Sequence, residues 1–243
     1  MAQKIKRVTL IKTGQTFDEL SARRGCFERW FAAGFAGRVE DWEVVHAHQG
    51  APLPPVTAPE AVVVTGSPVS VYERLPWSEA TAAWLAQLLE REIPVLGICY
   101  GHQLIAHALG GEVSRSPRGR EVGAVEIKGE DDPLFEGLGP QFSVWQSHID
   151  EVSVAPAGAR IIARNEHSAV QAMAIGDHCR TVQWHPEFDG EIGRHYIKAR
   201  AQLIDEERGE GAAARLEASQ PSDLPSGAQI LANFARAWLG APQ

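Results

Sequence analysis

A cysteine, Cys99, lies at the centre of the stretch "GICYG", between an apolar run over 93–98 and an amphipathic run. This order predicts a turn from a strand into a helix. The glycines on either side match the strained elbow that presents a nucleophile, with cysteine in the place of serine. A helix N-terminus favours the thiolate form, and the backbone N–H of Tyr100 is expected to donate to an oxyanion. The stretch therefore predicts thiol attack on a carbonyl group; a small buried thiol that only packs is the alternative.

A thiol nucleophile needs a general base, and the base needs a group that orients it. The stretch "TVQWHPEF" offers both, because His185 follows a predicted strand and Glu187 lies two positions later. Pro186 favours an extended conformation at His185, and residues two apart in an extended chain point to the same side. We therefore expect Glu187 to reach the imidazole. A strand-end histidine beside a solvated glutamate is the simpler interpretation of this stretch taken alone.

The other histidine pairs fit structural roles better than a metal site. His102 and His107 are five positions apart on one predicted helix, so they do not share a face. His46 and His48 would share one face of a strand, but no third ligand accompanies them. The sequence therefore predicts no metal site, and we expect no cofactor.

The elements around Cys99 alternate between strands and helices. The β-branched run over 61–68 and the apolar run over 93–98 predict strands that are buried on both faces. A helix is predicted between them over 78–91, and another follows Cys99. This rhythm predicts a doubly wound sheet, in which functional residues gather at the carboxyl ends of the strands. Further strands are predicted over 7–14, 42–48, within 122–154 and over 179–184, and further helices over 27–35, 192–204 and 229–239.

The stretch over 205–227 is rich in small and charged residues. We expect a mobile surface connection there, although its first half could extend the preceding helix. No internal repeat and no second core is evident. The sequence therefore predicts one domain over 1–243, with a catalytic core over about 1–190 and a C-terminal helical extension over about 191–243. Its expected fold class is α/β, a three-layer flavodoxin-like arrangement with a mostly parallel sheet flanked by helices.

Composition narrows the functional classes. The 243 residues carry a net charge of −8, so there is no basic surplus to bind nucleic acid. The local basic group of Arg115, Arg118 and Arg120 is expected to be a solvated loop. The N-terminal stretch lacks a signal peptide's apolar run, and no segment approaches a membrane span. Three widely spaced cysteines suit a reducing compartment, so we expect a cytoplasmic enzyme or binding protein.

The stretches "GICYGHQL" and "WHPEF" together resemble the catalytic signature of class I glutamine amidotransferases, the Cys-His-Glu glutaminases of the GMP synthetase type. "VVVTGSPVSVYERLPW" is similar to that family's oxyanion-loop region, "REVGAVEI" to its mid-domain strand and "FSVWQSHIDEV" to its substrate-binding segment. The resemblance spans most of 62–188 in the family's order. "LIKTGQTFDEL" and the Gly-Ser-Pro variant are more similar to stand-alone members, which include γ-glutamyl peptidases.

The resemblance implies a role for each matching residue. Cys99 would attack the side-chain amide of glutamine to form a γ-glutamyl thioester and release ammonia, His185 would move the proton, and Glu187 would orient His185. Tyr100 and Ser67 would donate backbone N–H groups to the oxyanion. The residues expected to hold the small-molecule substrate are Gly66, Gln103, Ser147, His148 and, as a weaker candidate, Asp150, which could instead be a turn cap.

Two departures from the family pattern affect the expected site. Ser67 stands where members often have glycine, and Ile149 stands where the synthetase type usually has glycine, which reshapes the pocket beside His148. The chain also lacks the phosphate-binding loops that activate an acceptor with ATP. Three functions therefore stay open: a glutaminase that feeds a synthetase partner chain, a stand-alone hydrolase of γ-glutamyl peptides or amines, and a non-catalytic redox-sensing or binding relative.

Overall fold

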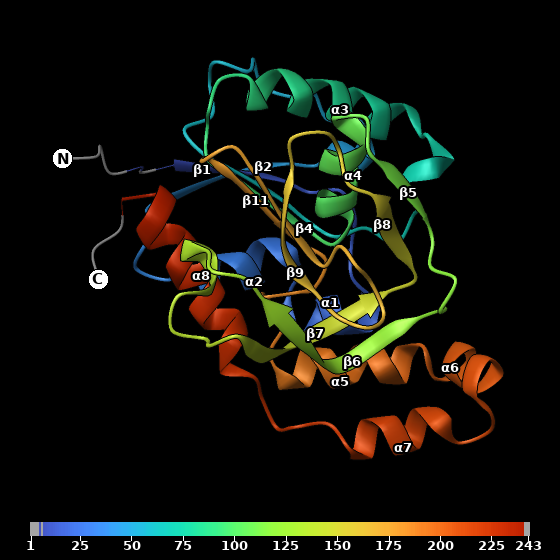
Figure 1. The fold of residues 1–243 in the computed structure, drawn as a ribbon. Helices are drawn as coiled ribbons and strands as arrows, with labels where there is room; N and C mark the ends of the chain where they lie inside the picture. Colours follow the sequence, from blue (N-terminus) through green and yellow to red (C-terminus); the bar gives the residue numbers. More distant parts are fainter. Residues whose placement is uncertain (1–4, 6, 241–243) are drawn as a thin grey trace.

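The computed structural model describes residue 5 and residues 7–240. A nine-stranded sheet crosses the molecule in the order β2-β1-β3-β4-β11-β10-β9-β6-β7 (Figure 1). The first five strands in this order are parallel, and the remaining four run antiparallel to their neighbours. Their bounds are β1 Arg7–Ile11, β2 Asp41–Val45, β3 Val62–Val64, β4 Val95–Ile98, β6 Glu121–Gly129, β7 Gln141–His148, β9 Arg160–Arg164, β10 Ala172–Ile175 and β11 Cys179–Val182.

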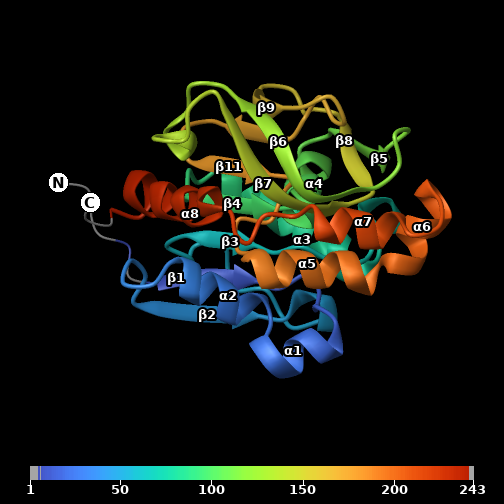
Figure 2. The same cartoon turned by 90° about the horizontal axis from the view of Figure 1, so that it is seen from below.

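Helices cover both faces of this sheet, so the predicted α/β class with flanking helices is confirmed (Figures 1 and 2). One apolar cluster joins α3 and α4 to the sheet, and another joins α2 and α8 to its opposite face. β5 and β8 form a separate two-stranded sheet. The bounds are α1 Asp18–Arg24, α2 Phe27–Gly34, α3 Pro76–Leu89, α4 Tyr100–Ala108, α5 Gly190–Ala199, α6 Ala201–Arg208, α7 Ala212–Ala218, α8 Pro225–Trp238, β5 Glu112–Arg115 and β8 Asp150–Val154.

The strands that lead to the site match their sequence pattern. β3 and β4 are buried along their whole length, as expected for parallel strands covered on both faces. The expected strand over 42–48 is only partly correct, because β2 ends at Val45 and a 3₁₀ turn follows over Ala47–Gln49. His46 and His48 therefore do not share a strand face. Among the described residues, no helix is both long and apolar enough to cross a bilayer.

The C-terminal part departs most from the sequence expectation. The helix predicted over 192–204 is broken at Arg200, between α5 and α6. The surface connection predicted over 205–227 is wrong for α7, whereas α6 fits the alternative that the first half of this stretch extends the preceding helix. Both helices lie beside α5 and β6 (Figure 2). Ile204 and Ala213 are buried against β6, and an Asp205 carboxylate oxygen accepts the Ala213 N–H at 2.8 Å. Tertiary burial thus stabilises helices that are too short to persist alone.

Helix α8 is fixed to the loop after β6 by one buried amide. The Asn233 Nδ2 atom donates to the carbonyl oxygens of Leu134 at 3.0 Å and Glu136 at 2.8 Å. We expect Asn233→Ala to lower the free energy of unfolding by about 2 kcal/mol, because two carbonyl groups lose their donor. Urea unfolding measures this change. Ala237→Ser on the exposed face of α8 is the matched control and should stay within about 0.5 kcal/mol of the native chain; equal losses in both variants would contradict the assignment.

Candidate active site

Cys99 occupies a strained turn between β4 and α4. Its backbone has φ 52° and ψ −101°, outside the favoured regions for a residue with a side chain. The two flanking glycines leave room for this turn between β3, β4 and α4. A Cβ on Gly101 would lie 2.5 Å from the Val64 carbonyl oxygen, and one on Gly97 would lie 2.9 Å from the Gly101 carbonyl oxygen. The expected elbow is therefore present, and it depends on close packing of α4 against β3 and β4.

His185 and Glu187 form a buried pair after β11. The His185 Nδ1 atom lies 2.8 Å from the Glu187 Oε1 atom. The predicted contact is present, but the chain reaches it through a turn closed by the Phe188 N–H donating to the His185 carbonyl, not through an extended segment. The backbone N–H of His185 donates to the Trp145 carbonyl at 2.9 Å, and the Phe188 ring stacks on the imidazole at 4.1 Å. These contacts fix the orientation of the imidazole.

The imidazole lies beside the thiol of Cys99. Burial lowers the pKa of His185, but the charges of Glu187 and Cys99 and hydrogen bonds to both outweigh it and raise the pKa to about 10. Since Nδ1 is paired with Glu187, Nε2 is the ring nitrogen left for Cys99. The histidine is therefore positively charged at neutral pH and can pair with a thiolate. Such a pair is the arrangement that an attacking cysteine requires.

The loop that follows β3 lies over this pair. A Cβ on Gly66 would approach the His185 Cε1 atom to 2.9 Å, so only glycine fits there without moving the ring. The buried hydroxyl of Thr13 lies 3.0 Å from the Gly66 carbonyl oxygen and 2.8 Å from that of Thr65. Gly14 packs against the same loop, because a Cβ there would lie 2.7 Å from the Pro68 Cδ atom. Sequence reasoning missed Thr13; its only signal was the Thr-Gly pair that ends the first predicted strand.

Two backbone donors predicted for the oxyanion border the thiol. Tyr100 is the first residue of α4, where an N–H has no acceptor within the helix. Its side chain points into the core beside α3, where the hydroxyl contacts Ser78 Oγ at 2.5 Å and burial raises the pKa of Tyr100 to about 12. Ser67 lines the two cavities that border Cys99. Both residues therefore lie near Cys99, and their backbone role stays a prediction.

Four of the five residues predicted to bind substrate, Gln103, Ser147, His148 and Asp150, line a polar cavity of about 90 Å³ beside Cys99. The fifth, Gly66, lines a second cavity instead. The Gln103 amide nitrogen donates at 3.0 Å both to the Asp150 carbonyl and to Gln183. The Asp150 carboxylate accepts from the hydroxyls of Ser70 at 2.6 Å and Tyr72 at 2.9 Å. Gln103 and Asp150 thus shape the cavity through internal bonds.

Ser147 and His148 differ in what they can offer a ligand. The buried Ser147 Oγ atom has no hydrogen-bond partner within the described part of the chain. By contrast, the His148 Nδ1 atom lies 2.8 Å from the Asp150 carbonyl oxygen and the Nε2 atom 2.9 Å from Glu121. Ser147 is therefore the side chain with a free polar atom, and His148 contributes a fixed wall.

Glu121 connects His148 to a buried polar network that sequence reasoning missed. Its carboxylate also accepts from Asn165 at 2.6 Å and from Gln171 at 2.7 Å. Burial raises the pKa of Glu121, but the hydrogen bond and charge of His148 together with these amides outweigh it and lower the pKa. The carboxylate therefore stays ionised and holds the His148 ring against the cavity.

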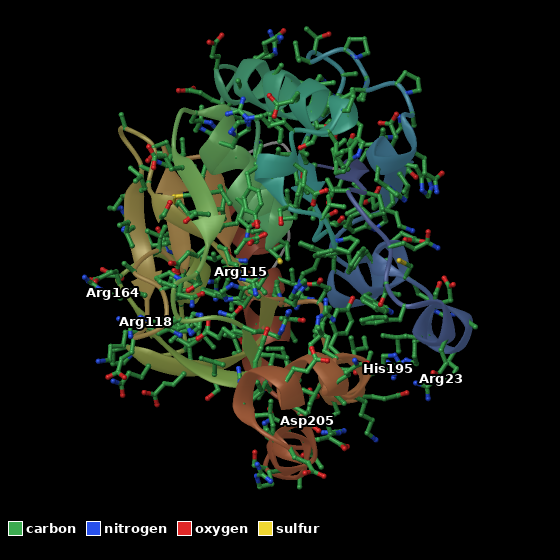
Figure 3. The ribbon with its side chains drawn as sticks, turned by 90° about the vertical axis from the view of Figure 1, so that its right-hand side faces the viewer. Arg23, Arg115, Arg118, Arg164, His195 and Asp205 are labelled. Atoms are coloured by element: carbon green, nitrogen blue, oxygen red, sulfur yellow. The ribbon has the colours of Figure 1, made fainter. Side chains whose placement is uncertain are left out.

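A second cavity of about 160 Å³ also borders Cys99 and shares Ser67, Ser147 and Arg200 with the polar cavity. Sequence reasoning missed its aromatic and cationic walls: Phe17 and Phe27 from the N-terminal segment, and Tyr196 and Arg200 from the C-terminal segment. The Tyr196 hydroxyl contacts Thr16 Oγ1 at 3.0 Å, which joins these two segments. Near the surface, α1 and α5 also contact each other, and the Nη2 atom of Arg23 lies 3.4 Å from the Nδ1 atom of His195 (Figure 3).

Three further observations concern the described residues outside this site. No group of three or more histidines, cysteines or acidic residues among them is arranged to hold a metal ion. An open hollow of about 660 Å³ lies along 129–140, and none of its lining residues borders Cys99. Arg115 and Arg118 are exposed, on the other side of the view from Arg23 (Figure 3). The polar and aromatic cavities around the thiol therefore form the candidate active site.

Several named proteins are similar to this chain in sequence. The chain is 34% identical over 206 residues to the glutamine-hydrolyzing GMP synthase of Thermosipho melanesiensis, a match that covers 82% of this chain and 37% of that protein. It is 37% identical over 149 residues to a subunit of the glutamine-hydrolyzing GMP synthase of Saccharolobus solfataricus, covering 60% of this chain and 76% of that subunit. The chain spans only 24% of the length of the GMP synthase of Thermomicrobium roseum, which is 44% identical over 131 residues.

The fold and a family model agree with these relatives. The crystal structure of a glutamine amido transferase from Methylobacillus flagellatus superposes with a TM-score of 0.72 over 96% of each chain, at 24% identity. The sequence model of the family "Glutamine amidotransferase class-I" matches residues 34–202. With the Cys99 elbow and the His185–Glu187 pair inside the matched range, this chain belongs to the class I glutamine amidotransferase family.

Proposed function

We propose that this chain hydrolyses the side-chain amide of glutamine through a thioester on Cys99. The observation that carries the proposal is the buried His185–Glu187 pair beside a cysteine at a strained strand-to-helix turn. A base that is oriented by a carboxylate and adjacent to a thiol is the arrangement used for acyl transfer. A redox sensor needs no such pair, so the arrangement argues against the non-catalytic alternative.

The mechanism begins with a thiolate–imidazolium pair. The Cys99 thiolate attacks the amide carbon, and the oxygen becomes an oxyanion that accepts from the backbone N–H groups of Tyr100 and Ser67. The carbon–nitrogen bond then breaks as His185 gives its proton to the departing ammonia. Water attacks the γ-glutamyl thioester after giving a proton to His185, and glutamate and the thiolate are released. Glu187 keeps the imidazole in one orientation throughout.

The polar cavity is assigned to the amino-acid end of the substrate. The Ser147 Oγ atom is its contact, while Gln103, His148 and Asp150 hold the shape of the cavity through internal hydrogen bonds. Gly66 lines the aromatic cavity and would contact the substrate from there. Since His148 and Asp150 already have partners, their mutation should affect substrate binding through the position of the wall.

The destination of the ammonia is a separate part of the proposal. The chain resembles one subunit of a GMP synthase and contains no ATP-binding loop of the kinds named above, so a partner synthetase chain would supply the acceptor. Glutamate formation by the isolated chain, compared with formation in the presence of a synthetase, distinguishes independent from partner-dependent hydrolysis.

Three buried free cysteines support a reducing, cytoplasmic location.

Substitutions in the three proposed catalytic residues should have graded effects. We expect Cys99→Ala to abolish thioester formation and His185→Asn to lower kcat by about 10³-fold or more. Glu187→Gln should lower kcat less, by about 10²-fold, because glutamine can still accept from Nδ1 and only the charge is lost. Trapping of the thioester and glutamate release measure these steps. A Glu187→Gln loss as large as that of His185→Asn would contradict the assigned roles.

The pH dependence should report the proton on His185. This proton is required by the leaving group, so kcat/KM should fall as the pH rises through about 10. Removing the charge of Glu187 lowers the pKa of His185, so Glu187→Gln should move this falling limb to lower pH. Rates measured as glutamate formed between pH 6 and 11 test the shift. An unchanged limb in the variant would show that another group sets it.

Gly66 provides a test of how closely the imidazole is confined. An added Cβ would press on the Cε1 edge of the imidazole while Phe188 stacks on the ring, so Gly66→Ala should lower kcat by about 10²-fold. Gly66 does not have a positive φ, so the variant should fold with nearly unchanged thermal stability. Steady-state kinetics and thermal melting measure the two effects. Full activity in a folded variant would exclude the proposed confinement.

A further inference from the structure

Arg200 is a cation at the active site, and no carboxylate among the described residues forms an ion pair with it. It lies at the break between α5 and α6 and lines both cavities beside Cys99. Its buried Nη1 atom has no hydrogen-bond partner in the described chain, and its guanidinium carbon lies 5.1 Å from the rings of Phe17 and Tyr196. Burial lowers the pKa of Arg200, although the charges of Tyr196 and Cys99 act in the opposite direction. An arginine stays protonated, so a residue that lines both cavities carries a buried, unpaired N–H group.

Two other arginines are paired with carboxylates, so the lack of such a pair at Arg200 is unusual within this chain. The buried guanidinium of Arg180 is paired with Asp132 at 3.0 Å. Arg120, which also borders the polar cavity, lies 3.3 Å from Glu207. An unpaired buried cation is costly, and a carboxylate is the group that matches the forked geometry of a guanidinium. The position of Arg200 therefore favours a carboxylate supplied by a ligand.

The aromatic cavity lies on the side of the thiol from which the leaving group departs. It is lined by Cys99 and His185, whereas the polar cavity is lined by Cys99 and Gln103 without His185. His185 gives its proton to the departing nitrogen in the proposed mechanism, so the amine leaves toward the cavity that contains this ring. A volume of about 160 Å³ is several times the roughly 30 Å³ that a water-sized molecule such as ammonia occupies.

We propose that the aromatic cavity binds the amine half of a γ-glutamyl amino acid and that Arg200 binds the carboxylate of this half. The inference rests on the thioester function proposed above and names its substrate class. Cys99 attacks the γ-carbonyl carbon, the carbon–nitrogen bond to the amino acid breaks, and the proton of His185 goes to the departing amine. Water then hydrolyses the thioester and releases glutamate. The rings of Phe17 and Tyr196 hold the guanidinium in place and contact the apolar part of the amine half.

The test compares two substrates that differ in one carboxylate. γ-Glutamylglycine has it, and γ-glutamylethylamine has a methyl group in its place. We expect Arg200→Met to lower kcat/KM for γ-glutamylglycine by about 10- to 100-fold, the range for losing a charge-assisted hydrogen bond. The value for γ-glutamylethylamine should change less than about threefold, which also shows that the variant is folded. Arg200→Lys, which keeps the charge, should recover part of the loss.

Arg23→Met is the control for removing an arginine near the contact of α1 with α5. Arg23 is exposed and borders neither cavity, so both substrates should keep their native kcat/KM. Equal losses for the two substrates in Arg200→Met would overturn the inference, because Arg200 would then serve the glutamyl half or the fold. Unchanged kcat/KM for both substrates in that variant would also overturn it. If the native chain forms glutamate from neither substrate nor from glutamine, the thioester function itself is wrong.

Discussion

The site depends on the close contact of three backbone segments at the carboxyl end of β4. Gly97 and Gly101 let α4 approach β3 and β4 so tightly that a Cβ at either position would overlap a neighbouring carbonyl group. This contact fixes the turn in which Cys99 holds a positive φ, and the turn places the sulfur at the mouth of two cavities. The strain at one residue is offset by packing over the elements around it. Every proposed step of the chemistry starts from that sulfur.

Paired charged groups surround the Cys99 sulfur, and they include a protonated imidazole although the chain as a whole is acidic. The carboxylate of Glu187 and the thiol of Cys99 keep a proton on a buried imidazole, against the effect of burial. A second buried carboxylate, Glu121, holds His148 at the edge of the polar cavity. In a low-dielectric interior each such group is costly unless it is paired, so the pairs also fix the geometry. Arg200 is the exception to this pairing: its buried Nη1 atom has no hydrogen-bond partner among the described residues, and the residue lines both cavities.

The helices after His185 contribute to the site as well as to the fold. Tyr196 and Arg200 come from this C-terminal part, and Phe17 and Phe27 reach the same cavity from the N-terminal part. The contact of Thr16 with Tyr196 joins the two parts beside the imidazole. The boundary expected at about residue 190 therefore does not separate residues that line the site from those that do not. The proposed specificity for the leaving group and the position of the base therefore involve the same wall.

The sequence by itself determined the parallel strands, the elbow at Cys99 and the His185–Glu187 contact, because these depend on local patterns: apolar runs, flanking glycines and a two-residue spacing. The path of that contact, a turn in place of extended chain, was decided by the packing of Phe188. Only the tertiary structure decided the break at Arg200 and the helix α7, since a segment as short as Ala212–Ala218 needs burial against β6 to persist. It alone also brought Phe17 and Arg200 together, because residues 183 positions apart meet through chain topology that no local spacing encodes.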